Sequence, residues 1–447
     1  MASKTLSSTV GIFIFIIVFS ASQLRAQSHP EYIPLGGGVK GALYKPDSGP
    51  APRVGILVMH RTVNFLSTTA CTQLSSRGFM VLCANPSSDN NEALVDWENM
   101  PLDVQRGVNF LKSQPGITKV ILWAHSGGGP LMTFYQAVAQ SGPTYCQGPN
   151  KLLQCGNNLA GLPPADGIIL ADAHPGNPIV GNLRTLHPGV FNEDRPDLIR
   201  PDLDPFDPKN GFNPNGPSTY SEEFKQNYFK EQAERMNRLI IEALDIVRRM
   251  EEGKHRFPDD DIFPIYKSGS GFGSAAGSAA LYLLDLNVLC CTVNPRRLLK
   301  NDGSIVTQPI RSVRVATPEN AEANQNFIDS TKLLTVRSFL GANAIRATHS
   351  MDYSQIDWCS SNNSTVCALD HVTIPMLIAG MGAHYFLGDA ELFYERSKSA
   401  DKDLIIIEGA THGFGRCIPC EQVTGQSYSN ATANFFNYVR DWINARF

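Results

Sequence analysis

Ser126 lies at the end of an apolar run and is followed by three glycines, in the stretch ILWAHSGGGP (121–130). On a sharp strand-to-helix turn, a serine adopts strained backbone geometry that exposes its hydroxyl group, and the residues two before and two after it must be small. Ala124 and Gly128 occupy these positions, and Gly129 leaves further room for a helix to pack. The stretch therefore predicts a nucleophilic Ser126, with a flexible glycine-rich turn as the alternative.

A nucleophilic serine needs a neighbouring base, and His412 is the candidate. It follows the apolar run DLIIIEG (403–409) directly, in the sequence GATHGF. Catalytic groups of open α/β sheets collect at the carboxyl ends of the strands, which is where this histidine is expected. We predict that His412 is the general base, and a purely structural histidine is the alternative.

An oxyanion formed during acyl transfer also needs two hydrogen-bond donors. The backbone N–H of Gly127, directly after the serine, is the first candidate. The second is expected in the loop HRTVNF (60–65), because this loop follows the apolar run VGILVM (54–59). We predict the backbone N–H of Arg61 or Thr62 as the second donor.

Three further histidines raise the question of a metal site. His384, His174 and His60 could form a cluster, but no two of them have a tight helical spacing such as H-x-x-x-H. We therefore predict no metal ion and no other cofactor.

The elements that must position these residues follow a regular pattern. Short apolar runs alternate with longer segments of helical character, which favours a parallel sheet flanked by helices. The candidate strands are 54–59, 79–84, 119–124, 167–172, 373–380 and 403–409. The candidate helices between and after them are 67–78, 103–114 and 433–447.

The segment between Asp172 and Val372 has a different character. It contains a stretch rich in Pro, Asp and Asn (200–218), followed by a long predicted helix from about Glu222 to Glu252. Thr219 and Glu222 have the spacing of a capping box, and Gly253 is expected to end the helix. We interpret this segment as a mainly helical cap inserted between two strands of the sheet.

Several of these segments resemble the α/β-hydrolase superfamily, in particular its serine esterases and lipases. RVGILVMH, LSSRGFMVLCAN, DVQRGVNFLKSQPGITKVILWAHSGGG, PMLIAG and IIIEGATHGF follow one another in the order typical of that family. The resemblance covers the predicted core and not the cap. It implies an α/β-hydrolase fold with the cap after the sixth strand, a nucleophile at Ser126, a base at His412 and hydrolysis of an ester-like bond.

The acid of such a triad is not at the usual place. Family members carry it in the loop after the strand that is here IPMLIAG, but this loop is MGAHYFLGD, with Ala383 at about the expected position. The other site known in the superfamily is the end of the preceding strand, where GIILADAHPG supplies Asp172. We predict Asp172 as the acid that orients the imidazole. Asp389, which also has the position of a helix N-cap, and Glu391 are the alternatives.

The N-terminus predicts export. Lys4 precedes the apolar run VGIFIFIIVF (10–19), which is short for a membrane span and typical of a secretory signal. An N-terminal anchor is the alternative. We predict a signal peptide at 1–26, with the core in two parts, 27–175 and 371–447, around a cap at 176–370.

An exported chain is expected to form disulfides and to carry glycans. Three cysteine pairs are close in sequence, namely Cys146 with Cys155, Cys359 with Cys367, and Cys417 with Cys420. The last pair, CIPC, also has redox or zinc-site spacing but lacks a second such pair, so we favour a structural bridge. Glycosylation sequons begin at Asn362, Asn363 and Asn430.

Charge and motifs together restrict the function. A formal net charge of −4 argues against nucleic acid or an anionic membrane as a partner. We predict a secreted, extracellular serine hydrolase without a stable membrane anchor, acting on a small-molecule ester or lactone; the oligomeric state stays open. An acyltransferase, peptidase or lyase on the same scaffold is the second hypothesis. A catalytically silent binding protein is the third, supported by the missing acid after IPMLIAG.

Overall fold

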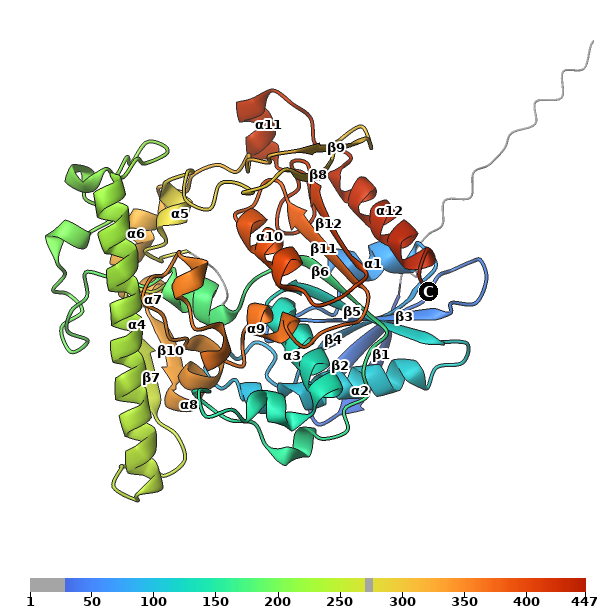
Figure 1. Ribbon diagram of the computed structural model, residues 1–447, viewed down its shortest axis with the longest axis horizontal. Helices are drawn as coiled ribbons and strands as arrows, with labels where there is room; N and C mark the ends of the chain where they lie inside the picture. Colours follow the sequence, from blue (N-terminus) through green and yellow to red (C-terminus); the bar gives the residue numbers. More distant parts are fainter. Residues whose placement is uncertain (1–28, 270–275) are drawn as a thin grey trace, which may run out of the picture.

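The computed structural model describes residues 29–269 and 276–447, so the predicted signal peptide lies outside the described residues. A ten-stranded sheet with the order β1-β2-β4-β3-β5-β6-β11-β12-β8-β9 runs through the molecule (Figure 1). Its strands are β1 (Glu31–Gly36), β2 (Val39–Tyr44), β3 (Val54–Met59), β4 (Met80–Asn85), β5 (Lys119–Ser126), β6 (Gly167–Ala173), β8 (Arg296–Leu299), β9 (Ile305–Gln308), β11 (Met376–Met381) and β12 (Lys402–Ile407).

The six predicted strands form the centre of this sheet. They are β4, β3, β5, β6, β11 and β12, and all neighbouring pairs among them are parallel. Along β3 the side chains alternate between two cores, with Leu57 and Met59 on one face and Ile56 and Val58 on the other. Burial on both faces explains why these strands are continuous apolar runs.

Helices cover both faces of the sheet, as predicted. α1 (Thr69–Ser75) and the closing helix α12 (Ala431–Asn444) pack on one face. The other face is covered by α2 (Met100–Lys112), α3 (Gly128–Ser141), α9 (Thr365–Leu369) and α10 (Leu387–Arg396). The predicted class, a mostly parallel sheet flanked by helices, is therefore confirmed.

The cap is built around the long helix α4 (Glu222–Glu251), which follows its outer side in Figure 1. The helix was predicted, but its N-terminal cap differs. Ser221 is the N-cap residue, and its hydroxyl oxygen accepts a hydrogen bond from the Phe224 N–H, 3.1 Å away. Glu222 is thus the first helical residue, so the predicted capping box of Thr219 and Glu222 is wrong.

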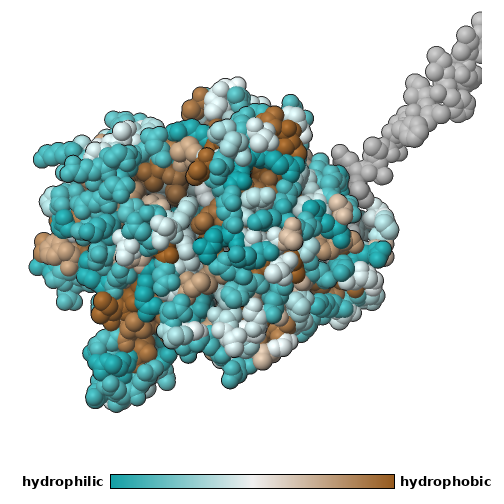
Figure 2. Space-filling view, in the orientation of Figure 1, coloured by the Kyte–Doolittle hydropathy of each residue, from teal (hydrophilic) through white to brown (hydrophobic). Residues whose placement is uncertain are grey.

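The cap also contains strands that the sequence analysis did not predict. β7 (Ile262–Ile265) and β10 (Lys332–Thr335) form an antiparallel pair, and the short helices of this region are α5 (Leu281–Leu284), α6 (Asn320–Gln325), α7 (Phe327–Ser330) and α8 (Val336–Ser338). Figure 2 shows a mostly hydrophilic surface with separate apolar patches, one of them over the part of the cap where β7 and β10 lie. Ile262 and Leu333 on these strands are 70% and 62% exposed.

The predicted cap range, 176–370, includes part of the main sheet. β8 lies parallel to β12, with Leu298 opposite Ile406 and Leu299 opposite Ile407. β9 then pairs with β8 in the antiparallel direction and forms the edge of the sheet. The boundary is therefore wrong for 296–308, where the inserted chain returns to the core before it enters the cap again.

All ten cysteines are paired. The three predicted disulfides, Cys146–Cys155, Cys359–Cys367 and Cys417–Cys420, are present, which makes CIPC a bridge within α11 (Ile418–Thr424) and its N-cap. The two further disulfides are Cys71–Cys83, which joins α1 to β4, and Cys290–Cys291, between adjacent residues. Within the described residues, no helix is both long and apolar enough to cross a membrane.

Two of the three predicted glycosylation sites are contradicted by burial. The amide nitrogen of Asn362 donates to the Leu153 carbonyl, and that of Asn363 donates to the Ala342 carbonyl. Both side chains are buried, so the folded chain leaves no room for a glycan on either nitrogen. Asn430 is exposed and stays a predicted site.

Candidate active site

Ser126 lies at the carboxyl end of β5, and its backbone has a φ of 54°. A positive φ is unfavourable for a residue with a side chain and marks a strained turn. A glycine is required at position 128, two residues after Ser126, because a Cβ there would lie 2.6 Å from the Met59 carbonyl oxygen. A Cβ on Gly129 would lie 2.7 Å from that of Ala173. The predicted strand-to-helix turn is therefore formed, with small residues where the backbones approach.

Asp172 is positioned at the end of the neighbouring strand β6. Its carboxylate is buried, and Oδ2 lies 2.6 Å from His412 Nδ1, in the loop after β12. The other oxygen, Oδ1, accepts a hydrogen bond from the Met381 N–H, 3.1 Å away. Burial alone raises the pKa of Asp172, but the contacts with His384 and His412 outweigh it and hold this pKa below its usual value. The acid is therefore ionised over the physiological pH range.

Neither alternative acid contacts His412. Asp389 lies in the first turn of α10, where its buried carboxylate pairs with Arg184 and accepts a hydrogen bond from the Tyr353 hydroxyl. Glu391 accepts hydrogen bonds from the Val293 and Asn294 N–H groups and pairs with Arg296. Both alternatives therefore lack the contact with His412 that the acid of a triad needs, and the N-cap role considered for Asp389 is wrong because Phe386 is the N-cap of α10.

The chain thus places a strained serine after β5, an acid after β6 and a histidine after β12 at one edge of a parallel sheet. This is the α/β-hydrolase fold. The strand order, the sharp turn after β5 and the order of serine, acid and histidine along the chain are its defining features. The expectation from the sequence resemblance is confirmed at the level of the fold.

Comparisons with known proteins add only distant likenesses. No protein-family model and no curated protein matches the sequence. Among solved structures, DcsB in complex with its substrate analogue has 11% identity and a TM-score of 0.42, over 91% of this chain and 94% of that chain. Brefeldin A esterase, a bacterial homologue of human hormone-sensitive lipase, has 9% identity and a TM-score of 0.38, over 98% and 81%. Est1E from Butyrivibrio proteoclasticus has 11% identity and a TM-score of 0.38, over 93% and 100%. We assign the fold from the strand order and connections of the chain itself.

The predicted oxyanion donors differ in whether their N–H groups already have a hydrogen-bond partner. The Thr62 N–H donates to Nδ1 of His60 at 3.1 Å, and the Val63 N–H donates to the same atom at 2.9 Å. This contact contradicts the prediction of Thr62 as a donor. The Arg61 N–H has no partner among the described residues, and Gly127 is the N-cap of α3, where N–H groups lack intrahelical partners. Gly127 and Arg61 remain the candidate donors.

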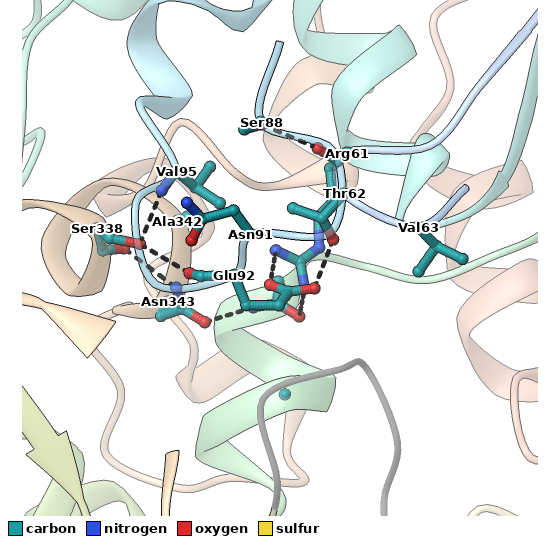
Figure 3. A network of polar contacts seen from close by, with 12 residues as sticks. Arg61, Thr62, Val63, Ser88, Asn91, Glu92, Val95, Ser338, Ala342 and Asn343 are labelled. Atoms are coloured by element: carbon teal, nitrogen blue, oxygen red, sulfur yellow. Dashed lines mark hydrogen bonds and ion pairs between the residues drawn. The ribbon is translucent and has the colours of Figure 1, made fainter. Parts of the chain in front are cut away.

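A buried polar network holds the loop after β3 (60–65), which we call the predicted oxyanion loop (Figure 3). The Arg61 guanidinium lies 2.7 Å from Oε2 of Glu92 and donates to Oε1 at 2.8 Å. The Thr62 hydroxyl donates to the same Oε1 at 2.5 Å, and Arg61 also donates to Asn177. An ion pair therefore joins the loop after β3 to the loop after β4, and a hydrogen bond from the same Arg61 side chain joins both to the segment after β6.

The network continues into the cap. The Ser338 hydroxyl donates to the Glu92 carbonyl oxygen at 3.3 Å, and the Asn343 amide donates to the Ser338 carbonyl oxygen at 3.0 Å (Figure 3). Asn343 in turn accepts a hydrogen bond from the Asn177 amide. The cap therefore contacts the predicted oxyanion loop through continuous hydrogen bonds, and the sequence analysis did not predict this connection.

We expect Glu92→Gln to lower both stability and turnover. The amide cannot pair with the buried Arg61 guanidinium, and breaking a buried ion pair in this way costs about 3–5 kcal/mol. Loss of order in the predicted oxyanion loop should lower kcat more than it raises KM. Urea denaturation and ester kinetics measure the two effects. The matched control is Glu252→Gln, at an exposed pair with Arg248, for which we expect little change in stability or turnover because solvent screens the pair. Equal effects of the two substitutions would contradict the assigned role of Glu92.

The three histidines considered in the sequence as a possible metal cluster, His60, His174 and His384, do not come together as one group of ligands. His60 and His174 are buried, and burial lowers the pKa of each well below its usual value. Among the described residues, the three whose ligating atoms could share a cation are Asp172, His384 and His412, within 4.8 Å of one another. His412 Nδ1 makes a hydrogen bond to Asp172 Oδ2 at 2.6 Å, and His384 Nδ1 lies 2.9 Å from the same oxygen.

His125 lies beside the nucleophile and has a structural contact. Its Nδ1 is 2.9 Å from the Ala171 carbonyl oxygen, and its ring lies against those of His412 and Phe414. Burial lowers the pKa of His125 to about 3, so it stays neutral and supports the ring of His412 without carrying charge.

Proposed function

We propose that this protein is a secreted serine hydrolase that cleaves a carboxylic ester or lactone through Ser126, His412 and Asp172. The observation that carries the proposal is the 2.6 Å contact between Asp172 Oδ2 and His412 Nδ1, at the sheet edge where Ser126 stands on its strained turn. The hypothesis of a silent binding protein depended mainly on a missing acid, and the Asp172 contact removes that support.

The reaction follows from the assigned roles. Ser126 Oγ attacks the carbonyl carbon while His412 Nε2 accepts the hydroxyl proton, and the Gly127 and Arg61 N–H groups bind the oxyanion. His412 then gives the proton to the leaving alkoxide, which departs as an alcohol and leaves an acyl group on Ser126. A water molecule, deprotonated by His412, releases the acid. Asp172 holds the imidazole and stabilises its charged form throughout.

Labelling with a fluorophosphonate tests the nucleophile without a known substrate. We expect the probe to modify Ser126 in the folded protein, as located by peptide mass spectrometry, and heat-denatured protein to stay unlabelled. A panel of aryl esters, lactones, anilides and alcohol acceptors then separates hydrolase from peptidase and acyltransferase. Modification at another serine, with Ser126 unlabelled, would exclude the proposed nucleophile.

A further inference from the structure

A group of three possible metal ligands lies around the carboxylate of Asp172. Its Oδ2 is 2.6 Å from His412 Nδ1 and 2.9 Å from His384 Nδ1, and the ligating atoms of the three residues lie within 4.8 Å of one another. Two imidazoles and one carboxylate form a ligand set that suits zinc and similar transition-metal ions. The proposed reaction uses Asp172 and His412 and gives His384 no role.

The nitrogen of His384 that faces this carboxylate makes no hydrogen bond within the described part of the chain. Nδ1 is buried and lies within hydrogen-bonding distance of Asp172 Oδ2, yet it has no hydrogen-bond partner. A hydrogen bond requires the N–H to point at its acceptor, so the in-plane bonding direction of Nδ1 passes beside the oxygen. An ion that both atoms bind also lies beside the line between them. This misalignment therefore fits metal coordination better than hydrogen bonding.

The surroundings hold His384 in place and leave His412 room to move. The His384 ring centroid lies 4.0 Å from that of Tyr385 and 4.5 Å from that of Phe386. Neighbouring ligand atoms of a tetrahedral zinc ion are roughly 3.3 Å apart, so the two nitrogens must withdraw slightly from Asp172 Oδ2. The side chain of His412 is 34% exposed, which permits this movement and gives an ion a path from the solvent.

The charges around the site favour an ion that binds reversibly. Asp172 supplies one negative charge, and Arg314 faces His384 from the inserted chain with a positive one. A single carboxylate opposed by a guanidinium attracts a cation less than the several anionic ligands of many structural zinc sites do. We therefore expect an ion that a chelator removes while the fold stays intact.

We propose that Asp172, His384 and His412 form an inhibitory site for a divalent transition-metal ion of the zinc class. The effect on turnover rests on the proposed function. The metal takes the lone pair of His412 Nδ1, so the one proton of the neutral ring moves to Nε2 by exchange with water. Nε2 then cannot accept the hydroxyl proton of Ser126, and Asp172 no longer orients the base. Catalysis stops until the ion leaves.

Zinc chloride added to an ester assay tests the effect on turnover. For the wild-type protein we expect at least a roughly tenfold loss of rate at micromolar zinc, reversed by EDTA, and no loss with Mg²⁺ or Ca²⁺, which prefer oxygen ligands. His384→Phe keeps an aromatic ring beside Tyr385 and Phe386 but removes the ligand nitrogen. Compared with its own zinc-free rate, this variant should resist zinc. His255→Phe is the matched control, because His255 also pairs with an aspartate, Asp261, at 3.0 Å, and this variant should stay sensitive.

Calorimetry on Ser126→Ala measures zinc binding without turnover. We expect one zinc ion to bind with an affinity that is lost on adding His384→Phe and kept on adding His255→Phe. If His384→Phe does not fold, anomalous diffraction from Ser126→Ala crystals soaked in zinc chloride should place the ion beside Asp172 Oδ2 and His384 Nδ1. Inhibition that persists in folded His384→Phe, or no zinc at this position, would overturn the inference. Zinc bound at His384 in a protein that hydrolyses no ester would instead place the failure in the proposed function.

Discussion

Ser126→Ala is expected to lower kcat for ester hydrolysis by about 10⁶-fold and to abolish fluorophosphonate labelling. The substitution removes the only atom that forms the acyl bond, while Cβ and the strained turn stay in place. KM should change little, because Oγ contributes mainly to the transition state. Kinetics with an activated aryl ester and active-site titration measure the effect.

The controls for Ser126→Ala test whether Ser126 and His412 act together as one unit. His412→Ala should cause a similar loss, and the double variant should be no worse than either single one, because serine and base act as one unit. His371→Ala, at an exposed histidine that contacts Ser141, should leave kcat unchanged. Additive losses from Ser126 and His412, or activity that persists in Ser126→Ala, would contradict the assignment of this pair.

Local sterics predicted the strained turn at Ser126, and a polar side chain directly after an apolar run predicted that His412 lies at the same edge of the sheet. The position of Asp172 was expected from the resemblance to the α/β-hydrolase superfamily. Local sequence patterns also explain why the six central strands were predicted and why β8 and β9 were not. β8 and β9 have four residues each and lie inside an irregular insertion, so no periodicity distinguishes them.

The remaining features depend on contacts that no local pattern encodes. Glu92 pairs with Arg61 only because of the path of the loop after β4, and His384 reaches Asp172 only because β11 lies beside β6. The position of His384, next to Ala383 where an acid was expected, was the one available signal for it. The sequons at Asn362 and Asn363 failed for the same reason, since a three-residue consensus contains no information about burial.

Asp172→Asn is expected to lower kcat by about 10⁴-fold while His412 stays in place. The amide can present its N–H to Nδ1, which favours the tautomer in which Nε2 carries the proton and cannot accept one from Ser126. Stability should also respond to pH. Because the pKa of Asp172 is held below its usual value, its ionised form stabilises the folded state fully above about pH 4. That contribution is lost as pH falls through the folded-state pKa. The difference in free energy of unfolding between Asp172→Asn and the wild-type protein should therefore become smaller below about pH 4.

Asp389→Asn is the matched control, because it makes the same chemical change at the other buried acid near the sheet edge. It leaves the buried Arg184 without its charge partner, so a loss of stability of about 3–5 kcal/mol is expected. The folded fraction of the Asp389→Asn variant should keep the wild-type kcat, since Asp389 does not contact His412. Comparing kcat per titrated active site with urea denaturation separates the two effects. Full activity in Asp172→Asn, or a 10⁴-fold loss of kcat in folded Asp389→Asn, would assign the acid to a residue other than Asp172.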